Sequence, residues 1–325
     1  MVKDKVTTKL EYFEKLWSSK NEVALLNALG MSNPPDGLSY LLRNKEKSNV
    51  KIVNYNTRSE ANFVFVVPTA NVDNKTSTDL RKQLKELPSI FVESTGENFN
   101  YAHSCNTGIS EALNAGYNWI IICNDDIKFQ ESPHNLEKFI NESNKNRVLT
   151  PDNRLSGNLK YHGETFSIFK TNPIILALVF YNIRWGFAGK RMPLDFLKNL
   201  IIRYPYLLKH FKYTIGVNNN EKVFARFSQR VSSHMINFSD FGIFPSEVLT
   251  KFKFDETFWN GTEDYDMVVR LKAANIEVNK IGLAVHSIGS ATFGHSVRKN
   301  VVSLLDAIYF SHKFSEIDAF PVEDY

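Results

Sequence analysis

The sequence contains little cysteine and no long apolar run, and both absences exclude whole classes of protein. Only two of its 325 residues are cysteines, and neither Cys105 nor Cys123 belongs to a CxxC pair. Disulfide-rich secreted domains and cysteine-based zinc sites are therefore disfavoured, and a reducing compartment fits. The best apolar candidate, residues 173–183, is shorter than the roughly 18 residues of a membrane-spanning helix. The first residues lack the apolar core of a secretory signal, so a cytoplasmic location is expected.

The charge balance is also mild. The formal net charge of +4 is too small to indicate a nucleic-acid partner by itself, and we expect none. Hydrophobic residues make up 43% of the chain and charged residues 23%, which is typical of a packed globular core rather than of disorder. The length suits one large domain with extensions.

The region that begins at residue 61 alternates between short apolar runs and amphipathic segments. Residues 62–68, 89–94 and 119–123 are rich in β-branched and aromatic residues, which indicates buried strands. Residues 76–88 and 106–117 lie between these runs and predict helices. The alternation predicts an α/β fold with a Rossmann-like, mainly parallel sheet flanked by helices. Ligands of such sheets bind beyond the carboxyl ends of the strands.

Two further segments differ from this α/β core. Residues 1–60 have apolar positions at helical spacing and predict a helical N-terminal extension. Residues 158–235 predict a helical insertion, in which residues 171–230 carry ten Lys or Arg against two Asp or Glu. Its basic, aromatic part at residues 184–213 fits either a peripheral contact with the cytoplasmic face of a membrane or packing on the domain. The predicted divisions are an extension (1–60), a domain that includes the insertion (61–315) and a C-terminal tail (316–325).

Two acidic residues follow the third predicted strand directly. Asn124, Asp125 and Asp126 come at the end of the apolar run WIIIC. Acids at a strand end often cap helices or form turns, but two adjacent carboxylates beside a buried strand repel each other. A divalent cation would relieve that repulsion, and hard oxygen ligands suit Mg²⁺ or Mn²⁺.

A second acidic group opens a predicted helix near residue 263. Glu263, Asp264 and Asp266 favour the positive end of the helix dipole, for which one or two acids would suffice. The additional acid leaves room for a catalytic base. His286 ends a predicted strand, and the Gly- and Ser-rich run after it favours a functional role over an ordinary structural one. Transfer from a nucleotide-sugar donor needs all of these groups together. The nucleoside needs a cleft, the departing diphosphate needs a cation, and the acceptor hydroxyl needs a general base.

Four segments, in order, resemble the GT-A fold glycosyltransferases, in particular the large inverting family 2 group that includes rhamnosyl- and galactofuranosyltransferases. They read FVFVVPTAN, ENFNYAHSCNTGISEALNAGYNWIIICNDDI, FDETFWNGTEDYDMVVRLKAANIEV and VHSIGSAT, and YFSHKF is similar to a family Y-F-x-x-K-W ending. The resemblance runs from Asn62 to Phe314. It implies a mixed, mainly parallel sheet and metal-dependent inverting sugar transfer with Mn²⁺ or Mg²⁺. The implied partners are a UDP-, GDP- or dTDP-linked sugar and a hydroxyl of a glycan or lipid-linked acceptor.

The resemblance also implies a role for each matching residue. Asp126 aligns with the last acid of the family's D-x-D motif and resembles its metal ligand, and His286 resembles an additional metal ligand. Asp264 resembles the general base, with Glu263 beside it. Asn124 stands where the first acid of the motif usually stands, and Asn100 replaces a usual glycine. The residues implied to line the nucleotide-sugar site are Pro68, Thr69, Asn71, Glu93, Asn106, Asn124 and Asp125.

Two alternatives share parts of this pattern. A nucleotidyltransferase acting on sugar phosphates also uses a nucleotide-binding α/β sheet and acidic metal sites. The segment PTANVDNK after the first strand lacks the glycine-rich phosphate loop and basic residue expected of such an enzyme. A catalytically inactive GT-A-fold binding protein is the second alternative, and the retained acids Asp126 and Asp264 disfavour it.

Overall fold

The computed structural model describes most of the α/β region. The described residues are 43, 45–57, 61–96, 98–143, 145–152, 240–259, 263–287 and 313. Most of the predicted extension, the whole basic insertion at residues 158–235 and the tail at residues 316–325 therefore lie outside them. No helix among the described residues is both long enough and apolar enough to cross a membrane.

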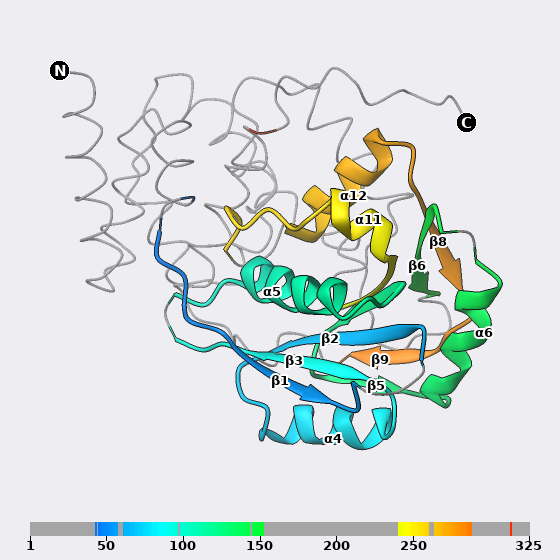
Figure 1. Cartoon of the computed structure of the whole chain (residues 1–325), viewed down its shortest axis with the longest axis horizontal. Helices are drawn as coiled ribbons and strands as arrows, with labels where there is room; N and C mark the ends of the chain where they lie inside the picture. The colour runs from blue at the N-terminus through cyan, green and yellow to red at the C-terminus, as the bar shows by residue number, and fades with distance from the viewer. Residues whose placement is uncertain are drawn as a thin grey trace, which may run out of the picture.

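A mixed sheet forms the centre of the described part, as Figure 1 shows. Its seven described strands have the order β1-β3-β2-β4-β7-β6-β8. Five run in one direction, whereas β1 and β7 run antiparallel to their neighbours. The predicted α/β class with a mixed, mainly parallel sheet is thereby confirmed. The strands are β1 (Lys51–Tyr55), β2 (Phe63–Thr69), β3 (Ser89–Glu93), β4 (Trp119–Cys123), β6 (Arg147–Pro151), β7 (Phe241–Pro245) and β8 (Glu277–Ile281).

Helices cover both faces of this sheet. The α4 helix lies on one face, and α5, α11 and α12 lie on the other (Figure 1). Alternate residues of β2 divide between the faces, with Val64 and Val66 packed on the α5 side and Phe63 and Phe65 on the α4 side. The helices are α4 (Lys75–Leu84), α5 (Tyr101–Asn114), α6 (Leu136–Asn141), α11 (Ser246–Lys251) and α12 (Glu263–Ala273), with a short 3-10 turn at Pro133–Asn135.

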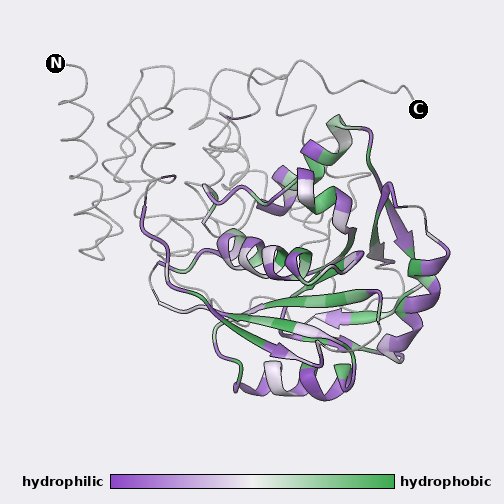
Figure 2. Ribbon diagram, viewed as in Figure 1, coloured by the Kyte–Doolittle hydropathy of each residue, from purple (hydrophilic) through white to green (hydrophobic). Residues whose placement is uncertain are grey.

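Burial follows from the position of each strand in the sheet. All residues of β2 and β4 are buried, as expected of central strands covered on both faces. Figure 2 shows these strands as mainly hydrophobic, while α4 turns a hydrophilic side outward. Helix α5 approaches β2 and β3 closely at Gly108, where an added Cβ would lie 2.4 Å from a methyl carbon of Val66.

The structure corrects two predicted boundaries. Residues 51–55, which the sequence placed in the helical extension, form β1 and pair antiparallel with β3, so the sheet begins before residue 61. The single strand predicted at residues 280–286 is divided. Its first part belongs to β8, and β9 (Val285–Ser287) pairs with β5 (Ile127–Phe129) in a separate two-stranded sheet.

Candidate functional site

The carboxyl ends of β2 and β3 meet at one edge of the sheet, as predicted. Thr69 at the end of β2 is opposite Glu93 at the end of β3. The backbone N–H of Ser94 donates to the Thr69 carbonyl at 2.9 Å. The Glu93 carboxylate accepts a hydrogen bond from the backbone N–H of Val72 at 2.9 Å. Two of the predicted nucleotide-site residues therefore share this edge, and the half-buried Glu93 is fixed by the β2–α4 loop.

Two other predicted residues of this edge differ in exposure. Pro68 is buried within β2, opposite Val92 of β3. Asn71 is exposed in the loop, where its side-chain oxygen accepts from the backbone N–H of Asp73 at 2.7 Å and so closes a local turn. Asn71 is available to a ligand at the edge, whereas Pro68 shapes the strand that carries it.

Asp125 anchors the start of α4. Its Oδ2 atom accepts from Thr69 Oγ1 at 2.7 Å, from Asn74 Nδ2 and Ser77 Oγ at 3.1 Å, and from Thr76 Oγ1 at 3.2 Å. The carboxylate lies at the helix N-terminus, where the helix dipole favours a negative charge. Asp125 was predicted to bind the nucleotide sugar. In the structure its side chain is buried and connects the end of β4 to the start of α4.

Asp126 and three further acids, Asp240, Glu263 and Asp264, form the group that we call the acidic cluster. The exposure of Asp126 is 4%, and that of Glu263 and Asp264, at the start of α12, is 6% and 5%. Ser287 Oγ donates to Asp126 Oδ1 at 3.4 Å. Burial, followed by the charges of Asp126 and Asp264, raises the pKa of Asp240 to about 7. Asp126 and Asp264, which were predicted as metal ligand and base, are therefore both near enough to Asp240 for their charges to act on its carboxyl group.

Asp240 is a member of this site that the sequence reasoning missed. It precedes β7 and lies directly across from Asn124, because Phe241 pairs with Cys123 in the antiparallel β4–β7 ladder. Asn124 Nδ2 donates to Asp240 Oδ1 at 2.7 Å, and Tyr101 Oη donates to Asn124 Oδ1 at 3.0 Å. The signal in the sequence was an acid, Asp240, immediately before the apolar run FGIFP. An acid before a strand lies at the ligand edge only if that strand runs antiparallel to its neighbours, as β7 does.

His286 does not lie beside Asp126 in the way the prediction required. Ser287 is the β9 residue whose side chain reaches Asp126, and His286 is its neighbour, opposite Lys128 of β5. Successive side chains of a strand point to opposite faces, so His286 points away from the carboxylate. No three His, Cys, Asp or Glu side chains among the described residues are arranged as a ready metal site.

Asn106 is also placed differently from its prediction. Its Nδ2 atom donates to the Phe254 carbonyl at 2.8 Å and to Glu256 Oε1 at 3.0 Å, and its Oδ1 accepts from the Phe254 N–H at 3.0 Å. Asn100, the cap of α5, donates to the carbonyls of Glu256 and Phe258. Both amides thus hold the loop at residues 252–259 against α5, and Asn106 has no amide hydrogen left for a nucleotide.

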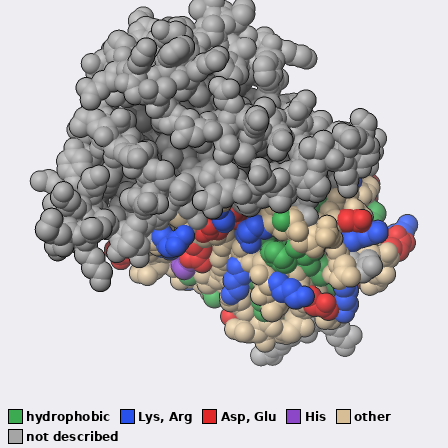
Figure 3. All heavy atoms as spheres, turned by 90° about the horizontal axis from the view of Figure 1, so that it is seen from above, with side chains coloured by type: hydrophobic (Ala, Val, Ile, Leu, Met, Phe, Trp, Pro, Cys, Tyr) green, Lys and Arg blue, Asp and Glu red, His purple; other side chains and the backbone are tan. Residues whose placement is uncertain are grey.

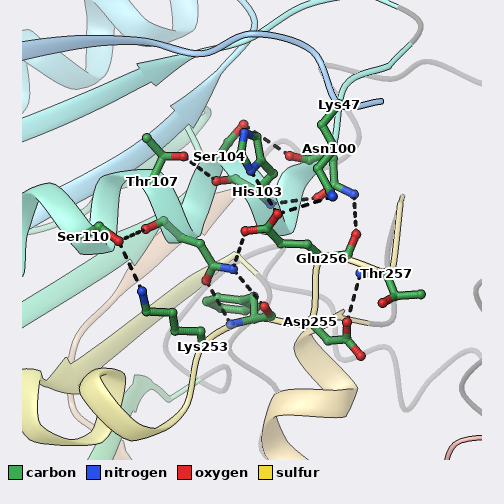
Figure 4. A network of polar contacts seen from close by, with 12 residues as sticks. Lys47, Asn100, His103, Ser104, Thr107, Ser110, Lys253, Asp255, Glu256 and Thr257 are labelled. Carbon is green, nitrogen blue, oxygen red and sulfur yellow. Dashed lines mark hydrogen bonds and ion pairs between the residues drawn. The ribbon is translucent and has the colours of Figure 1, made fainter. Parts of the chain in front are cut away.

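Figure 4 shows the polar network around this loop. Glu256 Oε2 lies 3.0 Å from His103 Nδ1 and 3.6 Å from Lys47 Nζ. Burial alone would raise the pKa of Glu256, but its hydrogen bond from Asn106 and the neighbouring His103 and Lys47 lower it. Basic, acidic and histidine side chains gather along one margin of the described part (Figure 3). The network keeps the loop before α12 in a fixed place.

Lys313 joins three segments that are distant in the sequence. Its Nζ atom lies 2.8 Å from Asp255 Oδ2 and also donates to Asp266 Oδ1. Asp266 is fully buried and accepts from Arg270 Nε at 2.7 Å. Burial alone would raise the pKa of Asp255, but Lys313 and the Thr257 N–H lower it to about 2. Lys313 thus links Asp255, in the loop before α12, to Asp266 on α12.

Comparison with known proteins does not extend these observations. The chain matches no protein-family model, and no curated protein is significantly similar to it.

Proposed function

We propose that this chain is a metal-dependent inverting glycosyltransferase of the GT-A type. It would move a sugar from a nucleotide-diphosphate donor to a hydroxyl of a glycan or lipid-linked acceptor. The observation that carries the proposal is that Asp126, which follows β4, and Asp264, at the start of α12, are both buried and that the charges of both act on Asp240. These two residues come from separate segments of the resemblance, and each has its own part in the chemistry.

The donor nucleoside would lie along the edge formed by β2 and β3. Glu93, held by the Val72 N–H, offers a carboxylate oxygen to a ribose hydroxyl or a base N–H, and Asn71 is exposed beside it. Ligands of α/β sheets occupy this position because the strands end there and the loops diverge. The diphosphate would then extend toward Asn124 and Asp126, at the end of the adjacent strand.

The acidic cluster suits a divalent cation by its charge. Burial of Asp240, followed by the charges of Asp126 and Asp264, raises its pKa to about 7, and the two neighbouring charges give the site an excess of negative charge. Mn²⁺ or Mg²⁺ accepts oxygen ligands and, when bound at Asp126, would neutralise the departing diphosphate. His286 is not proposed as a second ligand, because its side chain points away from Asp126.

Asp264 is proposed as the general base. The base takes the proton of the acceptor hydroxyl as its oxygen forms a bond to the anomeric carbon. The bond from that carbon to the diphosphate oxygen breaks on the opposite face, so the configuration inverts. Asp264 lies in the first turn of α12, and Glu263 is next to it in the chain.

Product analysis with the full chain tests this proposal. With a donor, an acceptor and Mn²⁺, we expect free nucleoside diphosphate and a glycosylated acceptor. Asp264→Asn should abolish transfer while donor binding survives, and Asp79→Asn, which changes a partly exposed acid on α4, is the matched control. Release of pyrophosphate would instead identify a nucleotidyltransferase. Donor binding without any product from the unaltered chain would identify a binding protein.

A further inference from the structure

We propose that Asp240 is a positioning residue that orients the Asn124 amide toward the nucleotide. This inference rests on the proposed function and deepens it, because it names a residue that determines how the donor is held. It concerns a pair of side chains on adjacent strands, Asn124 after β4 and Asp240 before β7.

The two residues form a cross-strand pair with both backbone and side-chain contacts. The Asn124 N–H donates to the Asp240 carbonyl at 3.1 Å, which extends the β4–β7 ladder by one residue. Asn124 Nδ2 donates to Asp240 Oδ1 at 2.7 Å. The backbone pairing fixes both Cα positions, so the side-chain bond has little freedom.

The surrounding groups favour one orientation of the amide. Asp240 Oδ1 accepts from Nδ2, which places the NH₂ group of Asn124 on the Asp240 side. Tyr101 Oη donates to the amide oxygen at 3.0 Å. Burial, followed by the neighbouring Cys105 and Glu263, raises the pKa of Tyr101 well above its ordinary value, so its hydroxyl keeps its proton. A flipped Asn124 amide would lose both the Nδ2 hydrogen bond to Asp240 and the hydrogen bond that Oδ1 accepts from Tyr101.

The oriented amide keeps one hydrogen for a ligand. The contact to Asp240 uses one hydrogen of Nδ2, and Asn124 is only half-buried at the end of β4, two residues from Asp126. The second hydrogen is a donor for an oxygen of the nucleotide, either on the ribose or on the diphosphate. A chain with an acid at position 124 would present an acceptor there, so the Asn124–Asp240 pair changes which oxygen the site recognises.

A double-mutant cycle with UDP, GDP and dTDP as probes, each with Mn²⁺, tests the inference by calorimetry. Asp240→Ala and Asn124→Ala should each weaken binding of the preferred nucleotide by about tenfold or more. Asp240→Ala should add almost nothing in the Asn124→Ala chain, because Asp240 acts through Asn124. Asp240→Asn should keep binding within about threefold, because its carbonyl still accepts from Nδ2. Asp79→Asn is the control with the same loss of charge.

The matching nucleoside without phosphates separates the two sources of the oxygen. Equal losses for uridine and UDP, for example, assign the contact to the ribose, and a loss for UDP alone assigns it to the diphosphate. If Asp240→Ala does not fold, Tyr101→Phe provides the second arm. It should weaken binding in the unaltered chain and not in the Asn124→Ala chain.

Several results would overturn the inference. Full additivity in the cycle, or normal binding by Asp240→Ala, removes the positioning role while leaving the proposed function in place. Failure of the unaltered chain to bind any of the three nucleotides would reject the proposed function and this inference together.

Discussion

At the scale of the residue, Asp125 and Asp126 are neighbours whose charges are accommodated in different ways. Asp125 is 3% exposed, and hydroxyl and amide groups of the α4 region surround its Oδ2 atom. Asp126 is 4% exposed and lies among other acids. The two carboxylates are thus held differently, because Asp125 accepts from the α4 region, whereas Asp126 accepts from Ser287 Oγ and its charge acts on Asp240.

The first prediction concerns Asp125. Asp125→Ala should destabilise the fold by about 2–4 kcal/mol, because it leaves buried donors of the α4 region without their shared acceptor. Urea unfolding measures this change, with the exposed Asp73→Asn as the control. Unchanged stability with a selective loss of nucleotide binding would show that Asp125 serves the ligand instead.

A second prediction concerns Asp240 and pH. Its pKa of about 7 in the fold exceeds the ordinary value of 3.8, so the folded chain binds more protons than the unfolded chain between these values. Stability should therefore fall as pH rises from about 4 to about 7. Asp240→Asn should remove this penalty and stabilise the chain above pH 7 by up to about 4 kcal/mol, with no gain near pH 4. Urea unfolding at pH 4 and above pH 7 measures this change. An equal change in stability from Asp240→Asn at both pH values would show that the ionisation of Asp240 is not its cause.

At the scale of the element, the ion pairs of Lys313 hold α12 and the loop before it. Asp266 on α12 is fully buried, and Asp255 lies in the loop. Burial alone would lower the pKa of Lys313, but Asp266 and Asp255 raise it. The start of α12 carries Asp264, so the proposed base is positioned partly by a lysine far along the chain.

A third prediction follows from this network. Lys313→Met should destabilise the fold by about 3 kcal/mol, because it leaves Asp266 buried with less compensating charge. Since Lys313 lowers the pKa of Asp255 to about 2, the contribution of Asp255 is complete above about pH 4 and is lost as pH falls toward 2. Urea unfolding at pH 7 and pH 3 measures both effects. A loss no larger than that of Lys82→Met, an exposed α4 lysine, would refute the structural role.

The elements differ in how far the sequence could predict them. Strands β2 and β4 were predictable because central parallel strands are buried on both faces and read as continuous apolar runs. Strand β1 was missed because an edge strand with one exposed face reads KIVNY, without such a run. The sequence assigned His286 to Asp126, but its neighbour Ser287 makes that contact. A shift of one residue along a strand moves a side chain to the opposite face. Asp240 could not be found because its partner Asn124 is 116 residues away, across an antiparallel pairing that local patterns do not encode.

At the scale of the whole molecule, the basic segment at residues 184–213 provides the fourth prediction. We propose that it holds the chain at the cytoplasmic face of an anionic membrane, near a lipid-linked acceptor. Co-sedimentation with anionic liposomes should fall when Lys198, Arg203, Lys209 and Lys212 are replaced by Gln, because each basic residue contributes roughly 1 kcal/mol at such a surface. Neutral liposomes are the control. Equal co-sedimentation of both chains would favour packing of the segment on the domain.

Metal-dependent donor binding at the acidic cluster is the central claim, and a thermal-shift screen of nucleotide sugars with and without Mn²⁺ tests it most directly. A bound ligand raises the melting temperature by mass action. We expect one class of UDP-, GDP- or dTDP-sugar to raise it only when Mn²⁺ is present. Asp126→Asn should lose that shift, and Asp264→Asn should keep it. No shift with any donor, or an equal shift for Asp126→Asn, would contradict the claim.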